Sequence, residues 1–586
     1  MTSLWDLLGR VPFAFSSRPK RTETIHNFTL LRSNHEDFPH THSTKSQNST
    51  PYLTPVFIIS TNEVMAPQIP LCSPQKSQKQ VFPRDNKAIA AWCTEANLLI
   101  NLSLPTVLIN VSAIIPQCVV ISFVGIRYGD AALSGMTLGF STMYMIYMSV
   151  ITGLLSASDT LSPQAFGLKK YDEVGVIALR SLIVSLVYFL IMLPLVWLKV
   201  ESILLSFGQD EGTAETATLF LRLSIPSIPF YIVYSVVWKF FSAQEIVYPV
   251  ACSSFLSSCI FLPMVLYLFG PSMSFEGAML CVDMCYVVQV VILFVLIYMI
   301  KPQRPETWSG SFWKNVNEAL RAKPMLYFCR LALGGVLSTS EWWFWEVMTL
   351  IAGNFGVVSL AAHAIPTQFL TIACTIAMSF GIAFNVRIGS TLAVNPEQAK
   401  HLCLWCYIVG ITISAALSLW FYHQQPLVTS MFTNDDDVLA LCTQIWPHVS
   451  IYTFHVCIFI QSIGIVNALG FQWTLGVLTV AILWVLALPA IYFGSVVRHG
   501  GLVMIWKLLY LPYFVINVLI AYICLSANFE QLSLELQRRE RTNSLAIERN
   551  EETDTTSTYT TSFYCTSSKS EKAFTYNGYG ALSTVM

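Results

Sequence analysis

The chain has 586 residues, of which 54% are hydrophobic and 11% are charged. Soluble proteins carry about 25% charged residues, whereas only 36 charges lie here between Leu98 and Ser526. This scarcity excludes a water-soluble body, and the net charge of −1 gives no sign of a nucleic-acid partner.

Twelve apolar runs follow one another along the chain, each long enough to cross a bilayer as a helix, which takes about 20 residues. They cover residues 98–123, 131–155, 174–198, 217–241, 247–269, 277–300, 325–352, 359–385, 400–422, 441–466, 472–494 and 501–525. They predict an all-α polytopic membrane protein with twelve transmembrane helices in two six-helix lobes. We expect a disordered tail at 1–94, lobes at 95–300 and 325–525, a loop at 301–324, and a Ser/Thr-rich tail at 526–586.

The basic residues between the runs predict the orientation. Ten lie in loops on the side of the two termini and three on the opposite side. Loops rich in Lys and Arg stay in the cytoplasm, so we expect both termini and the 301–324 loop to be cytoplasmic.

Corresponding loops of the two halves resemble each other. QAFGLKKYDEVG follows the second run, and STLAVNPEQAK follows the eighth. This similarity favours a duplication of a six-helix unit, with the two halves related by an axis along the membrane normal. The alternative is that amphipathic loops look alike without duplication.

Two carboxyl groups in the seventh run are the first candidates for a site. An ionisable side chain at the centre of a span costs about 2.5–3.5 kcal/mol on insertion scales, and GGVLSTSEWWFWEVMTLIAG holds both Glu341 and Glu346. Five residues turn a helix by about 500°, so the two point about 140° apart. We therefore expect at most one to be the primary site.

The surroundings of these acids suggest a chemistry. A carboxylic acid in an apolar cavity holds either a proton or a cationic solute, which is the exclusivity that antiport needs. Trp342, Trp343 and Trp345 offer ring faces to an organic cation. The alternative is that the tryptophans pack against lipid and the acids bond to neighbouring helices.

Other residues give weaker signals. Asp283, about one and a half turns into the sixth run, faces either a cavity or the membrane interface. A histidine such as His363 can titrate near neutrality, but an isolated histidine within a helix is more often a packing residue. Cys403 and Cys406 have the spacing of a zinc knuckle without a second pair, so we expect no metal. No Walker A motif and no nucleophile–base pair are recognisable, so we expect neither a nucleotide cofactor nor an enzyme.

Several motifs together resemble the multidrug and toxic compound extrusion (MATE) transporters, in their eukaryotic form. They fall in the family's order over residues 95–525: SDTLSPQAFGLKKYDEVG (158–175), the stretch 206–249, SFEGAML (274–280), SEWWFWE (340–346) and NVRIGSTLAVNPEQAK (385–400). The resemblance implies a V-shaped pair of lobes that exports organic cations and other xenobiotics by alternating access. The coupling ion would be the proton, with sodium as the alternative.

The resemblance also assigns residues. The family's essential acid maps onto Glu341, and its second acid onto Glu346. Gln368 stands where animal members carry a further acid, and Val456 replaces the acid of the tenth span, which puts substrate range and coupling stoichiometry in doubt. We expect substrate contacts from Trp342, Trp343, Asp283 and Gln368.

Alternative functions and the cellular setting stay open at this point. A lipid-linked or sugar flippase of the same superfamily is the main alternative, and the shortage of intramembrane arginine counts against it. A channel fits the helix count less badly than a receptor or an enzyme. We expect a monomer in the plasma membrane or the vacuolar membrane, with small organic solutes and the lipid bilayer as its partners.

Overall fold

The computed structural model describes residues 86–206, 209–308, 312–432 and 435–542, and all regular structure within these ranges is helical. Residues 1–85 of the predicted tail at 1–94 lie outside the described residues. Residues 543–586 of the Ser/Thr-rich tail also lie outside them. The first half of the chain contains α2 (Asn86–Tyr128), α3 (Asp130–Met143), η1 (Tyr144–Met148), α4 (Ser149–Gly167), α5 (Tyr171–Ser206), α6 (Glu211–Ser224), η2 (Ile225–Ser227), α7 (Ile228–Ala243), α8 (Tyr248–Phe255), η3 (Leu256–Phe261), α9 (Leu262–Phe269), η4 (Gly270–Ser272) and α10 (Phe275–Ile300).

The second half follows a short helical connection, η5 (Pro305–Trp308) and α11 (Phe312–Ala319). It contains α12 (Ala322–Ser338), α13 (Ser340–Gly353), α14 (Val357–Val394), α15 (Pro396–His423), α16 (Gln425–Phe432), α17 (Asp436–Leu469), α18 (Gln472–Thr479), η6 (Val480–Ala487), α19 (Leu488–Tyr492), η7 (Phe493–Val497) and α20 (Gly501–Ser526).

The twelve predicted spans are all present as helices. Among the described residues, eleven helical segments are long and apolar enough to cross a membrane. The twelfth is the pair α12 and α13, which a break at Thr339 divides into pieces of 17 and 14 residues. Several helices also run past the apolar part of their span. For example, α14 continues to Val394, beyond the predicted end at residue 385, and this extension carries Arg387.

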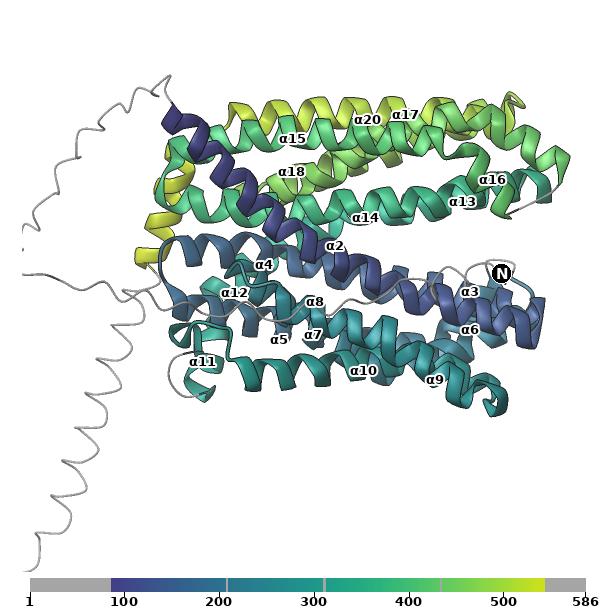
Figure 1. Cartoon of the computed structure of the whole chain (residues 1–586), viewed down its shortest axis with the longest axis horizontal. Helices are drawn as coiled ribbons and strands as arrows, with labels where there is room; N and C mark the ends of the chain where they lie inside the picture. The colour runs from purple at the N-terminus through teal and green to yellow at the C-terminus, as the bar shows by residue number, and fades with distance from the viewer. Residues whose placement is uncertain (1–85, 207–208, 309–311, 433–434, 543–586) are drawn as a thin grey trace, which may run out of the picture. The chain divides into compact units, whose positions relative to one another are not determined.

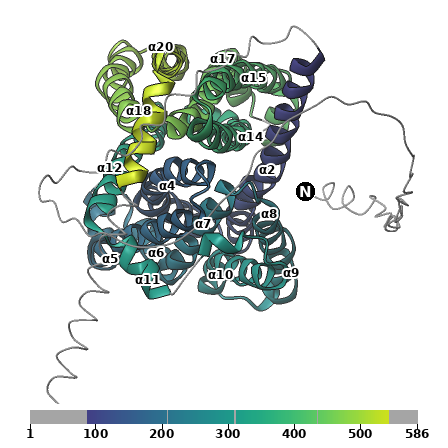
Figure 2. The same cartoon turned by 90° about the vertical axis from the view of Figure 1, so that its left-hand side faces the viewer.

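The two halves form two bundles that meet along α4. Helices of the first half (blue to teal) lie mainly on one side in Figures 1 and 2, and those of the second half (green to yellow) on the other. At the seam α4 packs against α12 and α14, while α2 crosses to α14. Glycine permits the close approach of α4 and α12, because a Cβ on Gly153 would lie 2.6 Å from the Cα atom of Val336 and a Cβ on Gly335 would lie 2.2 Å from the carbonyl oxygen of Gly153.

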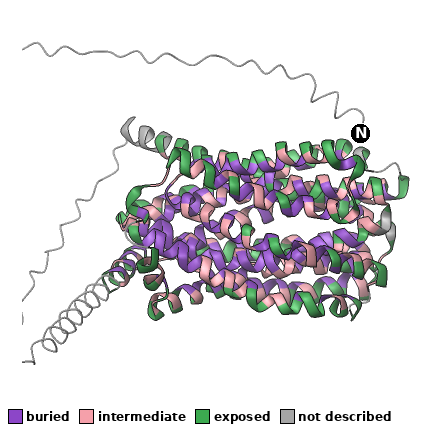
Figure 3. Cartoon of the chain, turned by 90° about the horizontal axis from the view of Figure 1, so that it is seen from below, coloured by how far each residue is buried: buried purple, intermediate pink, exposed green. Residues whose placement is uncertain are grey.

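A further helix, formed by residues 529–542 and called the tail helix below, packs against the bundle. Its buried residues Phe529, Ser533, Leu536 and Glu540 recur every three or four positions and so share one face. The sequence predicts only a Ser/Thr-rich tail over 526–586, and its described residues 529–542 form a helix that packs against the bundle. Figure 3 shows that the helices of the bundles are also buried where they face one another and exposed on their outer sides.

Candidate functional site

A break in the seventh span places Glu341. Ser338, Thr339 and Ser340 each turn their hydroxyl back to the carbonyl three residues earlier, over 2.7, 3.0 and 2.6 Å. Hydroxyls that bond to the backbone in this way compete with the helical pattern and bend helices. The chain restarts at Ser340, so Glu341 lies in the first turn of α13, where the helix dipole favours a negative charge.

The Glu341 side chain is buried and held by two donors. The residue is 4% exposed. Its Oε1 accepts hydrogen bonds from the Trp345 indole N–H at 3.0 Å and from the Tyr513 hydroxyl of α20 at 2.7 Å. No described residue is hydrogen-bonded to its second oxygen, Oε2, or forms an ion pair with the carboxylate. One oxygen therefore remains for a proton or a cation.

Aromatic rings from four helices surround this carboxylate. We call this group the aromatic cage, and it consists of Trp345 (α13), His363 (α14), Tyr452 (α17), Trp506 and Tyr513 (α20). Ring centroids are 5.1 Å apart for Trp345 and Tyr452, 5.0 Å for Tyr452 and Tyr513, and 5.3 Å for His363 and Trp506. Such faces attract organic cations. In the present conformation the cage is filled by its own side chains, since Glu341 is almost fully covered.

The other predicted residues of the seventh span face elsewhere. Trp342 stacks on Tyr144 of η1 with centroids 5.1 Å apart, and the Trp343 indole donates to Ser149 of α4 at 3.0 Å. Both therefore contact the first half of the chain rather than the cage. Glu346 is half-buried, and its carboxylate has no hydrogen-bond partner among the residues that the structure describes.

Asp283 and Gln368 are not part of the cage either. Asp283 lies inside the first bundle, 3% exposed, and is bonded to the hydroxyls of Ser224 and Ser227. The Asp283 side chain is therefore not exposed, as it would be if it extended to the membrane interface, the second of the two positions that the sequence left open. Gln368 on α14 is exposed, and no described contact links it to Glu341.

Sequence reasoning missed most of the cage. It named Trp345 beside the acids and set His363 aside as a packing residue, but it did not single out Tyr452, Trp506 or Tyr513. Tyr513 is 172 residues from Glu341, and a single sequence carries no signal for such a pairing. The only available hint was the presence of tyrosine and tryptophan in apolar spans, which is common in membrane proteins.

The bundles are bonded together at the end that holds the start of α2 and the tail helix, called the tail end below. The Thr160 hydroxyl donates to the Asn467 carbonyl at 2.6 Å, and the Gln164 amide donates to the Ala468 carbonyl at 3.0 Å. Gln472 also donates to Thr160. These bonds join α4 to the second half of the chain and close this end in the present conformation.

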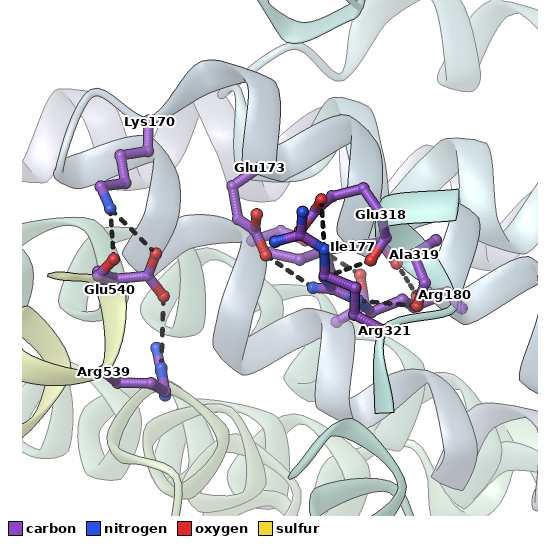
Figure 4. A network of polar contacts seen from close by, with 12 residues as sticks. Lys170, Glu173, Ile177, Arg180, Glu318, Ala319, Arg321, Arg539 and Glu540 are labelled. Atoms are coloured by element: carbon purple, nitrogen blue, oxygen red, sulfur yellow. Dashed lines mark hydrogen bonds and ion pairs between the residues drawn. The ribbon is translucent and has the colours of Figure 1, made fainter. Parts of the chain in front are cut away.

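Ion pairs reinforce the same end. Arg387 of α14 binds Glu245 at 2.6 Å and Glu95 of α2 at 2.9 Å, which adds a charged link across the seam. Figure 4 shows two neighbouring networks. In one, Arg180 binds Glu173 and the carbonyls of Glu318 and Ala319; in the other, Lys170 and Arg539 meet at Glu540.

Arg539 connects the tail helix to both halves. Its guanidinium donates to Gln164 of α4 at 3.2 Å and to the Tyr327 hydroxyl of α12 at 3.1 Å, and it lies 5.0 Å from the Tyr327 ring centroid. The tail helix therefore spans the closed seam.

Comparison with known proteins identifies a family with this architecture. The MatE family model matches residues 105–268 and 336–493, more than half of the chain. The chain is 30% identical over 409 residues to multidrug and toxin extrusion protein 2 of Oryctolagus cuniculus, covering 67% of this chain and 65% of the relative. It is 28% identical over 371 residues to multidrug and toxin extrusion protein 1 of Xenopus tropicalis, covering 62% of each. The chain thus spans less than two thirds of the length of these two relatives.

Solved structures agree in fold. The eukaryotic MATE transporter AtDTX14 has a TM-score of 0.70 at 22% identity, over 76% of this chain and 99% of that one. The Vibrio cholerae MATE transporter VcmN in its bent form has a TM-score of 0.63 at 15% identity, over 76% and 99%. At these identities the likeness concerns the fold of twelve helices in two bundles.

Proposed function

The chain belongs to the MatE family and is an integral membrane protein, and from this premise we propose that it exports organic cations and other xenobiotics in exchange for protons. The relatives named above are extrusion proteins, and none of them is named a flippase or an enzyme. The transport cycle would alternate between access from the two sides of the membrane. We place the tail end in the cytoplasm, as the basic loops predict, and the working unit is a monomer in the plasma or vacuolar membrane.

One observation carries the proposal: Glu341 is a buried acid bonded only to neutral donors and surrounded by aromatic rings. A buried carboxylate without a counter-ion is costly, so it takes up either a proton or a cation. The two occupants exclude each other, and this exclusion couples their opposite movements. Entry of a proton releases the organic cation, and loss of the proton restores the cation site.

Liposomes test this function directly. The purified full chain is reconstituted with an acidic interior, and uptake of a fluorescent organic cation is followed against its gradient. The matched control for Glu341→Gln is Glu276→Gln, which removes an exposed carboxylate in the first turn of α10. We expect accumulation by the wild type and by Glu276→Gln, and none by Glu341→Gln.

Two results would contradict the proposal. One is accumulation by Glu341→Gln at the wild-type rate and protein level. The other is wild-type accumulation that follows an imposed sodium gradient and ignores the proton gradient.

A further inference from the structure

A second helix break lies in the first bundle, opposite α10. The 3-10 turn η2 separates α6 from α7. Pro226 and Pro229 lie in or next to this turn, and because proline has no N–H, each removes a donor from the helical ladder. The turn holds Ser224 and Ser227 against α10, with which α6, η2 and α7 all pack.

Asp283 on α10 is bonded into this turn. Its Oδ1 lies 2.7 Å from the Ser227 hydroxyl, and its Oδ2 lies 3.2 Å from the Ser224 hydroxyl. The Ser227 hydroxyl also lies 2.8 Å from the Ser224 carbonyl oxygen. All three residues are buried, and within the described part of the chain Asp283 has no ion-pair partner.

Counting hydrogens shows what these three contacts require. A serine hydroxyl supplies one hydrogen, a carbonyl oxygen supplies none, and an ionised carboxylate supplies none. With Asp283 ionised, two hydrogens serve three oxygen–oxygen contacts, so either the Ser227 hydrogen is shared between Oδ1 and the Ser224 carbonyl or one contact joins two bare oxygens. With Asp283 protonated on Oδ1, the acid donates to Ser227, Ser227 donates to the Ser224 carbonyl, and Ser224 donates to Oδ2. Every contact then has its hydrogen.

We propose that Asp283 carries a proton in this conformation and is a second proton-binding site, in the first bundle and separate from Glu341. Its part in transport rests on the proposed function above. The proton leaves when the turn moves, because a full hydrogen bond from Ser227 to an ionised Asp283 forms at the expense of its hydrogen bond to the Ser224 carbonyl. Proton release is thereby tied to a rearrangement of the α6–α7 break.

The surroundings offer Asp283 no positive charge. The nearby titratable groups on α10 and on α7 opposite it are thiols and phenols, which ordinarily carry no charge near neutral pH: Cys281, Cys285, Tyr286 and Tyr231. The described charged side chains on the helices packed against α10 are engaged or exposed elsewhere: Arg222 with Glu201, Lys239 with Asp159, Glu95 with Arg387, Arg127 with the Pro271 carbonyl, and Glu211 and Glu215 at the surface. A proton is therefore the charge that neutralises Asp283.

The two buried acids differ in this respect. Glu341 accepts from an indole N–H and a phenol O–H, each of which brings its own hydrogen. Its contacts are complete whether it is ionised or not. Each contact of Asp283 has a hydrogen of its own only when the acid is protonated, so the count favours a protonated Asp283 and leaves Glu341 free to hold either charge.

Infrared difference spectroscopy of the purified full chain tests the assignment. The comparison is between the wild type and Asp283→Asn, whose amide mimics the protonated acid by donating to Ser227 and accepting from Ser224. At neutral pH we expect the variant to lose a protonated-carboxyl C=O band that the wild type shows. Glu276→Gln, which removes an exposed acid, should lose only carboxylate bands.

The opposite pattern overturns the proposal. If Asp283→Asn loses carboxylate bands and no protonated-carboxyl band, Asp283 is ionised. This reading does not depend on transport, so it stands even if the chain exports no organic cation. For its role in coupling, we expect Asp283→Asn liposomes to move fewer protons per cation than the wild type, and an unchanged ratio would exclude that role.

Discussion

The acids inside the bundles and the acids at the tail end are held in opposite ways. At the tail end five acids have a cationic partner: Glu173 with Arg180, Glu318 with Arg321, Glu540 with Lys170, and Glu95 and Glu245 with Arg387. Inside the bundles, Glu341 and Asp283 are bonded to indole, phenol and serine groups, and the described residues give them no ion pair.

This difference separates two tasks. A carboxylate beside an arginine keeps its charge, because neutralising either partner leaves the other as a buried charge without a counter-ion. Such a pair stabilises the fold, and the two pairs of Arg387 join the two halves of the chain. A buried carboxylate with neutral donors changes its charge when a proton or a cation arrives. Acids that exchange charge are thus kept apart from acids that fix the closed end.

The largest effect is expected within the interior group itself. Glu341→Gln should reduce proton-driven cation accumulation to the level of empty liposomes, because it removes the exchangeable charge from the aromatic cage. Glu346→Gln should reduce the initial rate several-fold at most, since Glu346 is half-buried and lies outside the cage. Both rates are measured in one liposome assay at equal protein, and equal losses would remove the distinction between the two acids.

The next effect concerns a tail-end pair. Arg180→Met should destabilise the fold by about 3–5 kcal/mol, because it leaves the buried Glu173 carboxylate without its counter-ion and removes the guanidinium donor from two carbonyls. Thermal unfolding of the purified protein measures the loss. Arg180→Lys keeps the charge and should lose less. A wild-type melting temperature for Arg180→Met would show that tail-end pairs do not hold structure.

A smaller effect is expected from the donors of Glu341. Tyr513→Phe removes a hydrogen bond to a charged group, worth about 1.5–3 kcal/mol, and should weaken organic-cation binding by about tenfold to a hundredfold. Equilibrium binding to the purified protein gives the change. The control is Tyr510→Phe on the same helix, whose ring stacks on His448 outside the cage. Equal affinities for the two variants would argue against the role of Tyr513.

The smallest effect concerns the tail helix. Arg539→Ala should cost about 0.5–1 kcal/mol, since its partly exposed guanidinium makes surface-type contacts with Gln164 and Tyr327. Hydrogen exchange of the backbone amides in 529–542 should speed up by a factor of a few. The exposed neighbour provides the control, as Arg538→Ala should leave exchange unchanged. Identical exchange in the two variants would mean that Arg539 does not anchor the helix.

The helical body was predictable because its signal is local. Apolar runs of span length fix the number of helices, and the Glu-Trp-Trp segment draws attention to Glu341. The break at Thr339 was also visible in principle, because three consecutive hydroxyl residues precede Glu341. It was missed because an uninterrupted apolar pattern extends on both sides of them.

The partners of the buried acids were not predictable, because they depend on packing between distant segments. Tyr513 reaches Glu341 from the last span, and Ser224 and Ser227 reach Asp283 from a turn about 60 residues away. Counting residues from the start of the span left Asp283 close enough to the interface to suggest exposure there. The proline-bearing turn opposite it supplies the hydroxyl groups that allow its burial.

Proton release on cation binding is the most direct measurement of the central claim, that Glu341 binds either a proton or an organic cation. An organic cation is added to the purified full chain in weakly buffered detergent solution, and the pH is followed with an indicator dye. We predict that the wild type releases protons as the cation binds and that Glu341→Gln does not. Cation binding to the wild type without proton release, or equal release from Glu341→Gln, would contradict the account.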